Sequence, residues 1–134
     1  MNIQEDYVSF ETAKLLREKG FNVETEHEMW YVVKQFSTGC HWNSCTYKVG
    51  DITREYNDDC CIPMPTLQMA IKWLREVYNI DIIAPPQYDN VKWTYSAIIF
   101  KLSIPYTEIR LNDNKDKKEE SCEAAIKYCL ENLI

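Results

Sequence analysis

The chain has 134 residues, of which 46% are hydrophobic and 27% charged, and its formal net charge is −6. These values are typical of one globular domain and exclude a disordered or fibrous chain. The negative charge disfavours nucleic acid as a partner, because that binding depends on Lys and Arg neutralising phosphates. Uninterrupted apolar stretches reach only about five residues, against roughly 20 for a membrane span, so we expect no membrane partner.

The first predicted helix covers Ser9–Lys19. Ser9 suits the N-cap, where its hydroxyl accepts from a free backbone N–H of the first turn. Gly20 suits the left-handed residue that ends a helix, and Phe21 can then fold back onto the last turn. The apolar stripe of this helix contains Phe10, Ala13, Leu15 and Leu16.

Two strands are predicted next. Met29–Phe36 is rich in β-branched and aromatic residues, which favour strands. Ser44–Val49 is expected to return antiparallel to it, across a loop formed by Ser37–Asn43.

The second predicted helix covers Pro65–Tyr78 and has the strongest periodicity. Pro65 suits the first helical turn, where a missing N–H has no cost, and Asn79 is expected to end the helix. Apolar residues recur at helical spacing at Leu67, Ala70, Ile71, Leu74, Val77 and Tyr78.

Three further strands are predicted before the last helix. Ile80–Ala84 is short and ends at Pro85-Pro86, which are expected to prevent further pairing. Lys92–Ser103 is the longest strand candidate, and Tyr106–Leu111 follows it.

The last predicted helix covers Glu119–Leu133, with Ser121 as an alternative N-cap. Its buried stripe is expected to contain Cys122, Ala125, Ile126, Cys129, Leu130 and Leu133.

The element order α-ββ-α-βββ-α predicts a single α+β domain over residues 1–134, with a mainly antiparallel sheet and about three helices. Its C-terminal part, α-β-β-β-α, matches the element order of double-stranded RNA-binding domains. A nucleic-acid-binding module therefore stays an alternative, which requires four basic residues to converge on one face: Lys92, Lys101, Arg110 and Lys115.

Six cysteines need an interpretation. Cys40, His41, Cys45, Cys60 and Cys61 lie within 22 residues and are possible zinc ligands. Their spacing differs from paired CxxC motifs, so free thiols are favoured, and a Cys/His metal-binding protein stays an alternative. The spacing leaves open whether Cys40, His41, Cys45 and Cys60 approach one another, and the redox state of Cys60 and Cys61. Cys122 and Cys129 are expected to be small buried hydrophobic residues.

No catalytic arrangement is visible. His27 and His41 are the only histidines, and the three glycines are not clustered as a phosphate loop requires. We therefore predict no catalytic residue, no cofactor and no metal site, and a chain that is not an enzyme. The acidic Met1–Asp6 has no apolar core of a signal peptide, which favours the cytoplasm.

Aromatic residues are unusually frequent, with nine Tyr, four Trp and four Phe. Trp93 and Tyr95 alternate along one predicted strand, with Lys92 beside them. Such rings can stack bases or anchor a protein interface. We expect them mainly to fill and rim the core.

Two segments carry a family resemblance. Val8–Phe21, VSFETAKLLREKGF, and Pro63–Asn79, PMPTLQMAIKWLREVYN, resemble motifs in a family of short uncharacterised proteins from phages and prophages of gut-dwelling anaerobic bacteria, and Glu119–Leu130 is a looser match. The resemblance implies a mobile-element origin and a bacterial cytoplasm, and it implies no activity.

The leading functional expectation is a small non-enzymatic accessory or protein-interaction protein that binds a protein partner or forms a homo-oligomer. The small-molecule ligand, if there is one, stays open. Exposed, paired aromatic residues would support this expectation.

Overall fold

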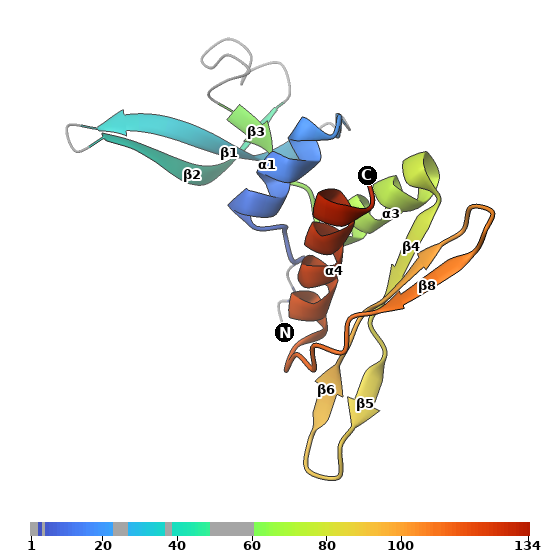
Figure 1. Cartoon of the computed structure of the whole chain (residues 1–134). Helices are drawn as coiled ribbons and strands as arrows, with labels where there is room; N and C mark the ends of the chain where they lie inside the picture. The colour runs from blue at the N-terminus through green and yellow to red at the C-terminus, as the bar shows by residue number, and fades with distance from the viewer. Residues whose placement is uncertain (1–2, 4, 23–26, 37–38, 49–60) are drawn as a thin grey trace. The chain divides into compact units, whose positions relative to one another are not determined.

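A computed structural model describes residues 3, 5–22, 27–36, 39–48 and 61–134, with 27–36, 39–48 and Cys61 described through their backbone. These residues form an α+β fold of three helices and antiparallel sheets, as predicted (Figure 1). The chain divides into two compact units, where the sequence predicts one domain. We call Tyr7–Pro65 the N-terminal unit, and Met1–Asp6 with Thr66–Ile134 the C-terminal unit.

The elements of the N-terminal unit are α1 (Phe10–Glu18), β1 (His27–Phe36), β2 (Gly39–Lys48) and β3 (Cys61–Pro63). Those of the C-terminal unit are α3 (Leu67–Tyr78), β4 (Ile80–Ile83), β5 (Pro86–Tyr88), β6 (Trp93–Tyr95), β7 (Ile98–Lys101), β8 (Thr107–Arg110) and α4 (Lys118–Asn132).

Both ends of α1 follow the sequence prediction. The Ser9 side chain accepts a hydrogen bond from the backbone N–H of Thr12, at 3.3 Å. Gly20 has φ 93°, a conformation that side chains with a Cβ rarely adopt. The Phe21 N–H donates to the Leu16 carbonyl at 2.9 Å, which completes a Schellman motif.

The β1–β2 hairpin is longer than predicted. The two strands pair from His27↔Lys48 to Phe36↔Gly39, so β2 begins at Gly39 and the predicted loop Ser37–Asn43 is too long. Residues of low strand propensity are recruited here by pairing with a strongly β-forming partner strand. The sequence also misses β3, which pairs with the other edge of β1.

Helix α3 begins two residues later than predicted. Thr66 is the N-cap and accepts from the backbone N–H of Met69 at 3.1 Å, so Pro65 precedes the cap instead of occupying the first turn. Asn79 ends the helix in the left-handed conformation, as expected. In α4 the N-cap is Lys117, which makes no side-chain cap hydrogen bond. The alternative cap at Ser121 is wrong, because that residue lies buried within the helix.

The predicted strand Lys92–Ser103 is divided into β6 and β7. Between them the Ser96 hydroxyl donates to Asn114 Oδ1 and accepts from the Asn114 backbone N–H, both at 3.0 Å. These bonds tie the chain to a distant loop and interrupt the strand. Pro86 also differs from expectation, because it begins β5 and pairs with Tyr95. Proline is tolerated there because the first residue of an edge strand needs no N–H bond.

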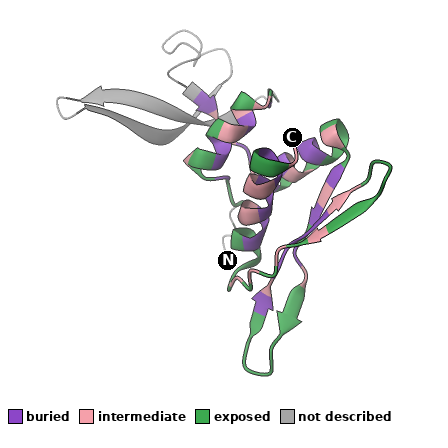
Figure 2. Ribbon diagram, viewed as in Figure 1, coloured by how far each residue is buried: buried purple, intermediate pink, exposed green. Residues whose placement is uncertain are grey.

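The core of the C-terminal unit lies between α3, α4 and the antiparallel sheet β4-β7-β8. Strand register places Ile80, Ile82 and Ile99 on one face of this sheet, and all three are buried (Figure 2). The helices contribute Leu67, Ala70, Trp73, Leu74, Cys122, Ala125, Ile126, Cys129 and Leu130. Across the described residues, no helix has the length and apolar content to cross a membrane.

Alanine substitutions at two buried serines are expected to change the free energy of unfolding in opposite directions. Ser96→Ala is expected to lower the free energy of unfolding by about 1–3 kcal/mol, because Asn114 then loses its partner. Ser121 is fully buried and its hydroxyl has no hydrogen-bond partner among the described residues. Ser121→Ala is therefore expected to raise the free energy of unfolding by about 0.5–1 kcal/mol, through lower desolvation cost and better helix propensity.

Urea denaturation of the two variants and the unchanged chain measures both effects. Equal destabilisation by the two substitutions would show that the Ser121 hydroxyl has a stabilising partner, and would contradict the prediction.

Candidate functional site: an exposed aromatic face

The β5–β6 hairpin presents aromatic side chains to solvent. Strand register pairs Pro86 with Tyr95 and Tyr88 with Trp93, so these four residues share one face of the hairpin. We call them the aromatic face. Tyr88 is 56% exposed and Trp93 is 60% exposed, and their ring centroids lie 5.2 Å apart at an interplanar angle of 38°.

The polarity of this hairpin is inverted relative to an ordinary half-buried strand. Thr94 lies on the opposite face and is only 3% exposed, and its hydroxyl donates weakly to the Gln87 carbonyl at 3.5 Å. Helix α4 contacts β6. The strand therefore buries a polar residue and exposes a tryptophan (Figure 2). Of the rings expected to fill and rim the core, Trp93 does not fill it, because it is 60% exposed, whereas Tyr95 is half-buried.

The turn of the hairpin is fixed by Asp89. Its Oδ1 accepts from the backbone N–H groups of Lys92 at 2.8 Å and Val91 at 2.9 Å. The bond from Lys92 has the larger effect and the bond from Val91 the smaller one, and together they lower the pKa of Asp89 below its ordinary value. Asp89 is therefore anionic at neutral pH, and its two hydrogen bonds constrain the turn.

The hairpin is also tied to the loop before α4. Lys92 Nζ lies 2.8 Å from Asp116 Oδ1, and this bond raises the pKa of Lys92 and lowers that of Asp116. Both side chains are well exposed, so the pair positions the hairpin more than it stabilises the fold. The pairing also neutralises the charge of Lys92 next to the aromatic face.

Each edge of the hairpin is interrupted for further strands. On the β6 side, Tyr95 and Lys115 exchange two backbone hydrogen bonds of 2.8 Å. On the β5 side, Pro86 has no N–H to donate. A partner strand therefore finds no continuous row of backbone groups on either side.

The basic residues required by the nucleic-acid alternative are not brought onto one face. Lys92 is paired with Asp116, and Arg110 lies 2.7 Å from Glu108. Lys101 is opposite Thr107 and Arg110 is opposite Ile98. Lys101 and Arg110 are therefore three positions apart along the β7–β8 ladder, on opposite faces and about 10 Å from each other.

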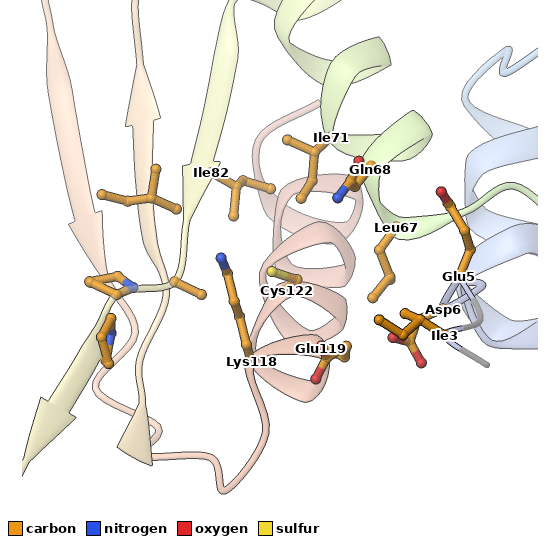
Figure 3. Close-up of a pocket in the computed structure, with 14 residues that line it drawn as sticks. Ile3, Glu5, Asp6, Leu67, Gln68, Ile71, Ile82, Lys118, Glu119 and Cys122 are labelled. Atoms are coloured by element: carbon orange, nitrogen blue, oxygen red, sulfur yellow. The ribbon is translucent and has the colours of Figure 1, made fainter. Parts of the chain in front are cut away.

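A second feature of the C-terminal unit is a pocket of about 630 Å³ between β4, α3 and the start of α4 (Figure 3). Its walls are mainly apolar, with charged residues around them. The apolar group includes Leu67, Ile71, Ile82, Ala84 and Cys122, and the charged group is Glu5, Asp6, Lys118 and Glu119.

The pocket residues are not arranged for nucleophilic chemistry. Burial raises the pKa of the Cys122 thiol, and the nearby Lys118 ammonium offsets this only in part. Cys122 therefore stays a protonated thiol at neutral pH, and a thiol without an activating base is a weak nucleophile. Among the described residues that line the pocket there is no histidine. The pocket therefore suits a small, mainly apolar group, held by van der Waals contacts.

In the described residues, the possible zinc ligands between Cys40 and Cys61 do not come together as a compact set. Cys40 and Cys45 lie on the same strand β2, five positions and therefore about 17 Å apart. Two thiolates on one zinc ion bring their sulfur atoms within about 4 Å, so these two cannot share an ion. His41 pairs with Lys34 through the backbone, and Cys61 pairs with Val32. Cys60 lies outside the described residues, and the described side chains contain no group that could hold a metal.

The sequence identified Trp93 and Tyr95 but missed Tyr88 and Pro86, which complete the aromatic face. The missed signal is the Tyr88–Trp93 segment itself, in which two aromatic residues flank a turn that begins with Asp89. Asp and Asn are typical of such turns, and this pattern predicts a hairpin.

Searches of family models, of curated proteins and of solved structures find no match to this chain.

Proposed function

We propose that this chain is a small, non-enzymatic interaction protein that binds a partner protein through the aromatic face. The observation that carries the proposal is the exposure of Tyr88 and Trp93 as a contacting pair on a braced hairpin. Trp and Tyr, together with Arg, are the residues most enriched among those that dominate binding energy at protein interfaces. A rigid aromatic pair also loses little conformational entropy when it binds.

The second hairpin of the C-terminal unit supports an interaction role. At the end of β7–β8, Leu102 and Tyr106 are exposed and Ile104 is 100% exposed. The Tyr106 ring stacks on Phe100 with 6.4 Å between centroids. Monomeric proteins rarely gather exposed apolar side chains without a binding role, so this tip is a candidate for a second contact.

The proposal includes a phage or prophage origin and a bacterial cytoplasm. Its support is the resemblance of Val8–Phe21 and Pro63–Asn79 to phage and prophage proteins. The thiols of Cys122 and Cys129 are free and buried, which suits a reducing compartment.

The experiment is capture of a partner by the immobilised full-length chain, followed by a titration of the purified partner. The double variant Tyr88→Ser/Trp93→Ser is expected to weaken the partner's affinity by at least about 30-fold, the effect of losing a dominant interface residue. Val77→Ser is the matched control, because Val77 is an exposed apolar residue on α3 of the same unit.

Ile104→Ser is a second control that reports on the other hairpin. A partner bound equally well by the double variant and by Val77→Ser would refute a role for the aromatic face. Sedimentation velocity of the same proteins measures self-association, and a dimer that the double variant abolishes would identify a second copy as the partner.

A further inference from the structure

We infer that two copies of this chain associate through strand β8, which pairs antiparallel with itself about a two-fold axis at Ile109. The three-stranded sheets of the two copies then become one continuous sheet. This contact uses a different hairpin from the aromatic face, so the inference goes beyond the proposed function. It rests on the backbone groups of β8, on its charge pattern and on the position of the helices.

Backbone hydrogen bonds show which groups of β8 point away from the sheet. The Leu111 N–H donates to the Ala97 carbonyl at 3.1 Å, so Leu111 faces β7. Because backbone groups alternate in direction along a strand, Ile109 also directs its N–H and C=O toward β7, whereas Glu108 and Arg110 direct theirs outward. Among the strands that the structure describes, none pairs with this outer side of β8.

The opposite edge of the same sheet, β4, is less available. The Leu102 N–H donates to the Asn79 carbonyl at 2.8 Å, so the same alternation directs the Ile82 N–H away from β7. Asp81 Oδ1 already accepts from that N–H at 2.9 Å. Helices α3 and α4 also contact β4, and Figure 1 shows β8 on the side of the sheet away from them. The β8 edge therefore has both free backbone groups and room for another strand.

The charges of β8 select one register for a pair of such strands. Glu108 and Arg110 lie on one face of β8, because they are two positions apart. Antiparallel pairing through their outward backbone groups can place Glu108 opposite Glu108, Arg110 opposite Arg110, or Glu108 opposite Arg110. Like charges directly opposite one another are destabilising, so the third register is favoured. The two-fold axis then forms both cross-strand Glu–Arg pairs at once.

The ion pair within each chain fits this register. Arg110 Nη2 lies 2.7 Å from Glu108 Oε1. The association therefore joins two such pairs into a group of four charges with alternating signs. Each carboxylate is placed near two guanidinium groups, and no charge is left unpaired at the contact.

The same register brings the Ile109 side chains of the two copies together. Residues at a non-hydrogen-bonded antiparallel position have Cα atoms only about 4.5 Å apart, and pairs of β-branched residues there are favourable. Ile109 is half-buried in the single chain, so the association covers surface that is still exposed. Tyr106 directly precedes β8 and is 59% exposed, and it extends the contact along the same edge.

A second copy fits this edge better than a strand of another protein. An edge with like charges repels a second copy of itself, whereas β8 carries one charge of each sign around an isoleucine. Its best antiparallel complement has an acidic and a basic residue two positions apart with a β-branched residue between them. The β8 sequence itself, TEIR, supplies this pattern.

Sedimentation velocity of the full-length chain at about 5–500 μM tests the association. The paired segment is short, so the interface is at the small end of specific interfaces, and we expect a reversible dimer with Kd on the order of 10⁻⁵–10⁻⁴ M. Glu108→Arg and Arg110→Glu are each expected to weaken it at least about tenfold, because each places like charges across the axis. Lys72→Glu is the matched control, because Lys72 is an exposed cation on α3, 3.9 Å from Glu76, and its reversal is expected to leave the dimer unchanged.

An equimolar mixture of the Glu108→Arg and Arg110→Glu chains tests the register. In the mixed pair, the two arginines of one chain face the two glutamates of the other. The mixture is therefore expected to dimerise at least about tenfold more tightly than either variant alone. Both variants keep a negative net charge, so a general attraction between the chains does not explain such a recovery. Amide exchange of Glu108 and Arg110 is also expected to slow as the unchanged chain is concentrated, while that of Ile109 stays the same.

Three outcomes would overturn the inference: a monomer at every concentration, a dimer that Glu108→Arg and Arg110→Glu do not weaken, or a mixture that binds no more tightly than the separate variants. Circular dichroism of each variant checks its fold. Tyr88→Ser/Trp93→Ser is expected to leave the dimer intact, and its loss there would assign self-association to the aromatic face instead. If no dimer forms while partner capture depends on Tyr88 and Trp93, the inference fails and the proposed function stands. If the dimer follows the β8 charges while capture is independent of those rings, the proposed function fails and the inference stands.

Discussion

Replacing Leu74 by alanine is expected to lower the free energy of unfolding by about 2–5 kcal/mol. Leu74 lies on the buried face of α3 and is fully inaccessible to solvent. Truncation removes its transfer free energy and leaves a cavity that the surrounding helices and sheet refill only in part. Urea denaturation followed by circular dichroism measures the change as a lower midpoint with an unchanged slope.

Val77→Ala is the matched control for this prediction. Val77 belongs to the same helix but is 55% exposed, so its truncation is expected to change stability by no more than about 0.5 kcal/mol. Similar losses for Leu74→Ala and Val77→Ala would contradict the packing of α3 described above.

Alkylation of Cys129 by iodoacetamide at pH 8 is expected to be about 10³-fold slower in the native chain than in the urea-denatured chain. Burial raises the pKa of this thiol to about 12, whereas an exposed cysteine has a pKa near 8.5. Since only the thiolate reacts, the reactive fraction at pH 8 falls from about a quarter to about 10⁻⁴. Peptide mapping by mass spectrometry resolves Cys129 from the other cysteines.

Cys122 provides the internal control for this measurement, because it lies on the same helix two turns away. Its thiol lines the pocket and its pKa is also raised by burial, but Lys118 offsets part of the effect. Cys122 is therefore expected to react faster than Cys129 in the native chain, and at the same rate after denaturation. A native Cys129 rate within tenfold of the denatured rate would contradict its burial.

Both ends of α1 and the C-terminus of α3 could be predicted from the sequence because they depend on neighbouring residues. Ser9, Gly20 and Asn79 each act within one turn of the helix that they begin or end, so the sequence pattern contains the whole cause. Helical periodicity also predicted Leu67, Ala70 and Leu74 in the buried stripe of α3. It wrongly included Val77, which is 55% exposed, and it left out Trp73, which is buried.

The division of the long strand into β6 and β7 could not be predicted, because its cause is distant in sequence. Ser96 bonds to Asn114, which is 18 residues away. Likewise, the pairing of Pro86 depends on the register with Tyr95, which no local pattern specifies. The start of β2 at Gly39 has the same origin in its partner strand.

The orientation of Trp93 shows why the candidate site could be predicted from the sequence only in part. The alternation of Trp93, Thr94 and Tyr95 shows that the first and third residues share a face, but not which face is covered. Hydrophobicity favours burial of the aromatic side, and the structure buries Thr94 instead. The decisive factor is the packing of α4 on β6, which is a tertiary contact.

The interrupted edges of the β5–β6 hairpin also affect how the chain behaves when it is concentrated. An exposed hairpin with aromatic side chains is normally a template for intermolecular cross-β growth and aggregation. Pro86 on one side and the Tyr95–Lys115 bridge on the other interrupt the row of backbone groups from which such growth starts. We therefore expect this hairpin to seed fibrils less readily than a hairpin of the same composition with continuous edges.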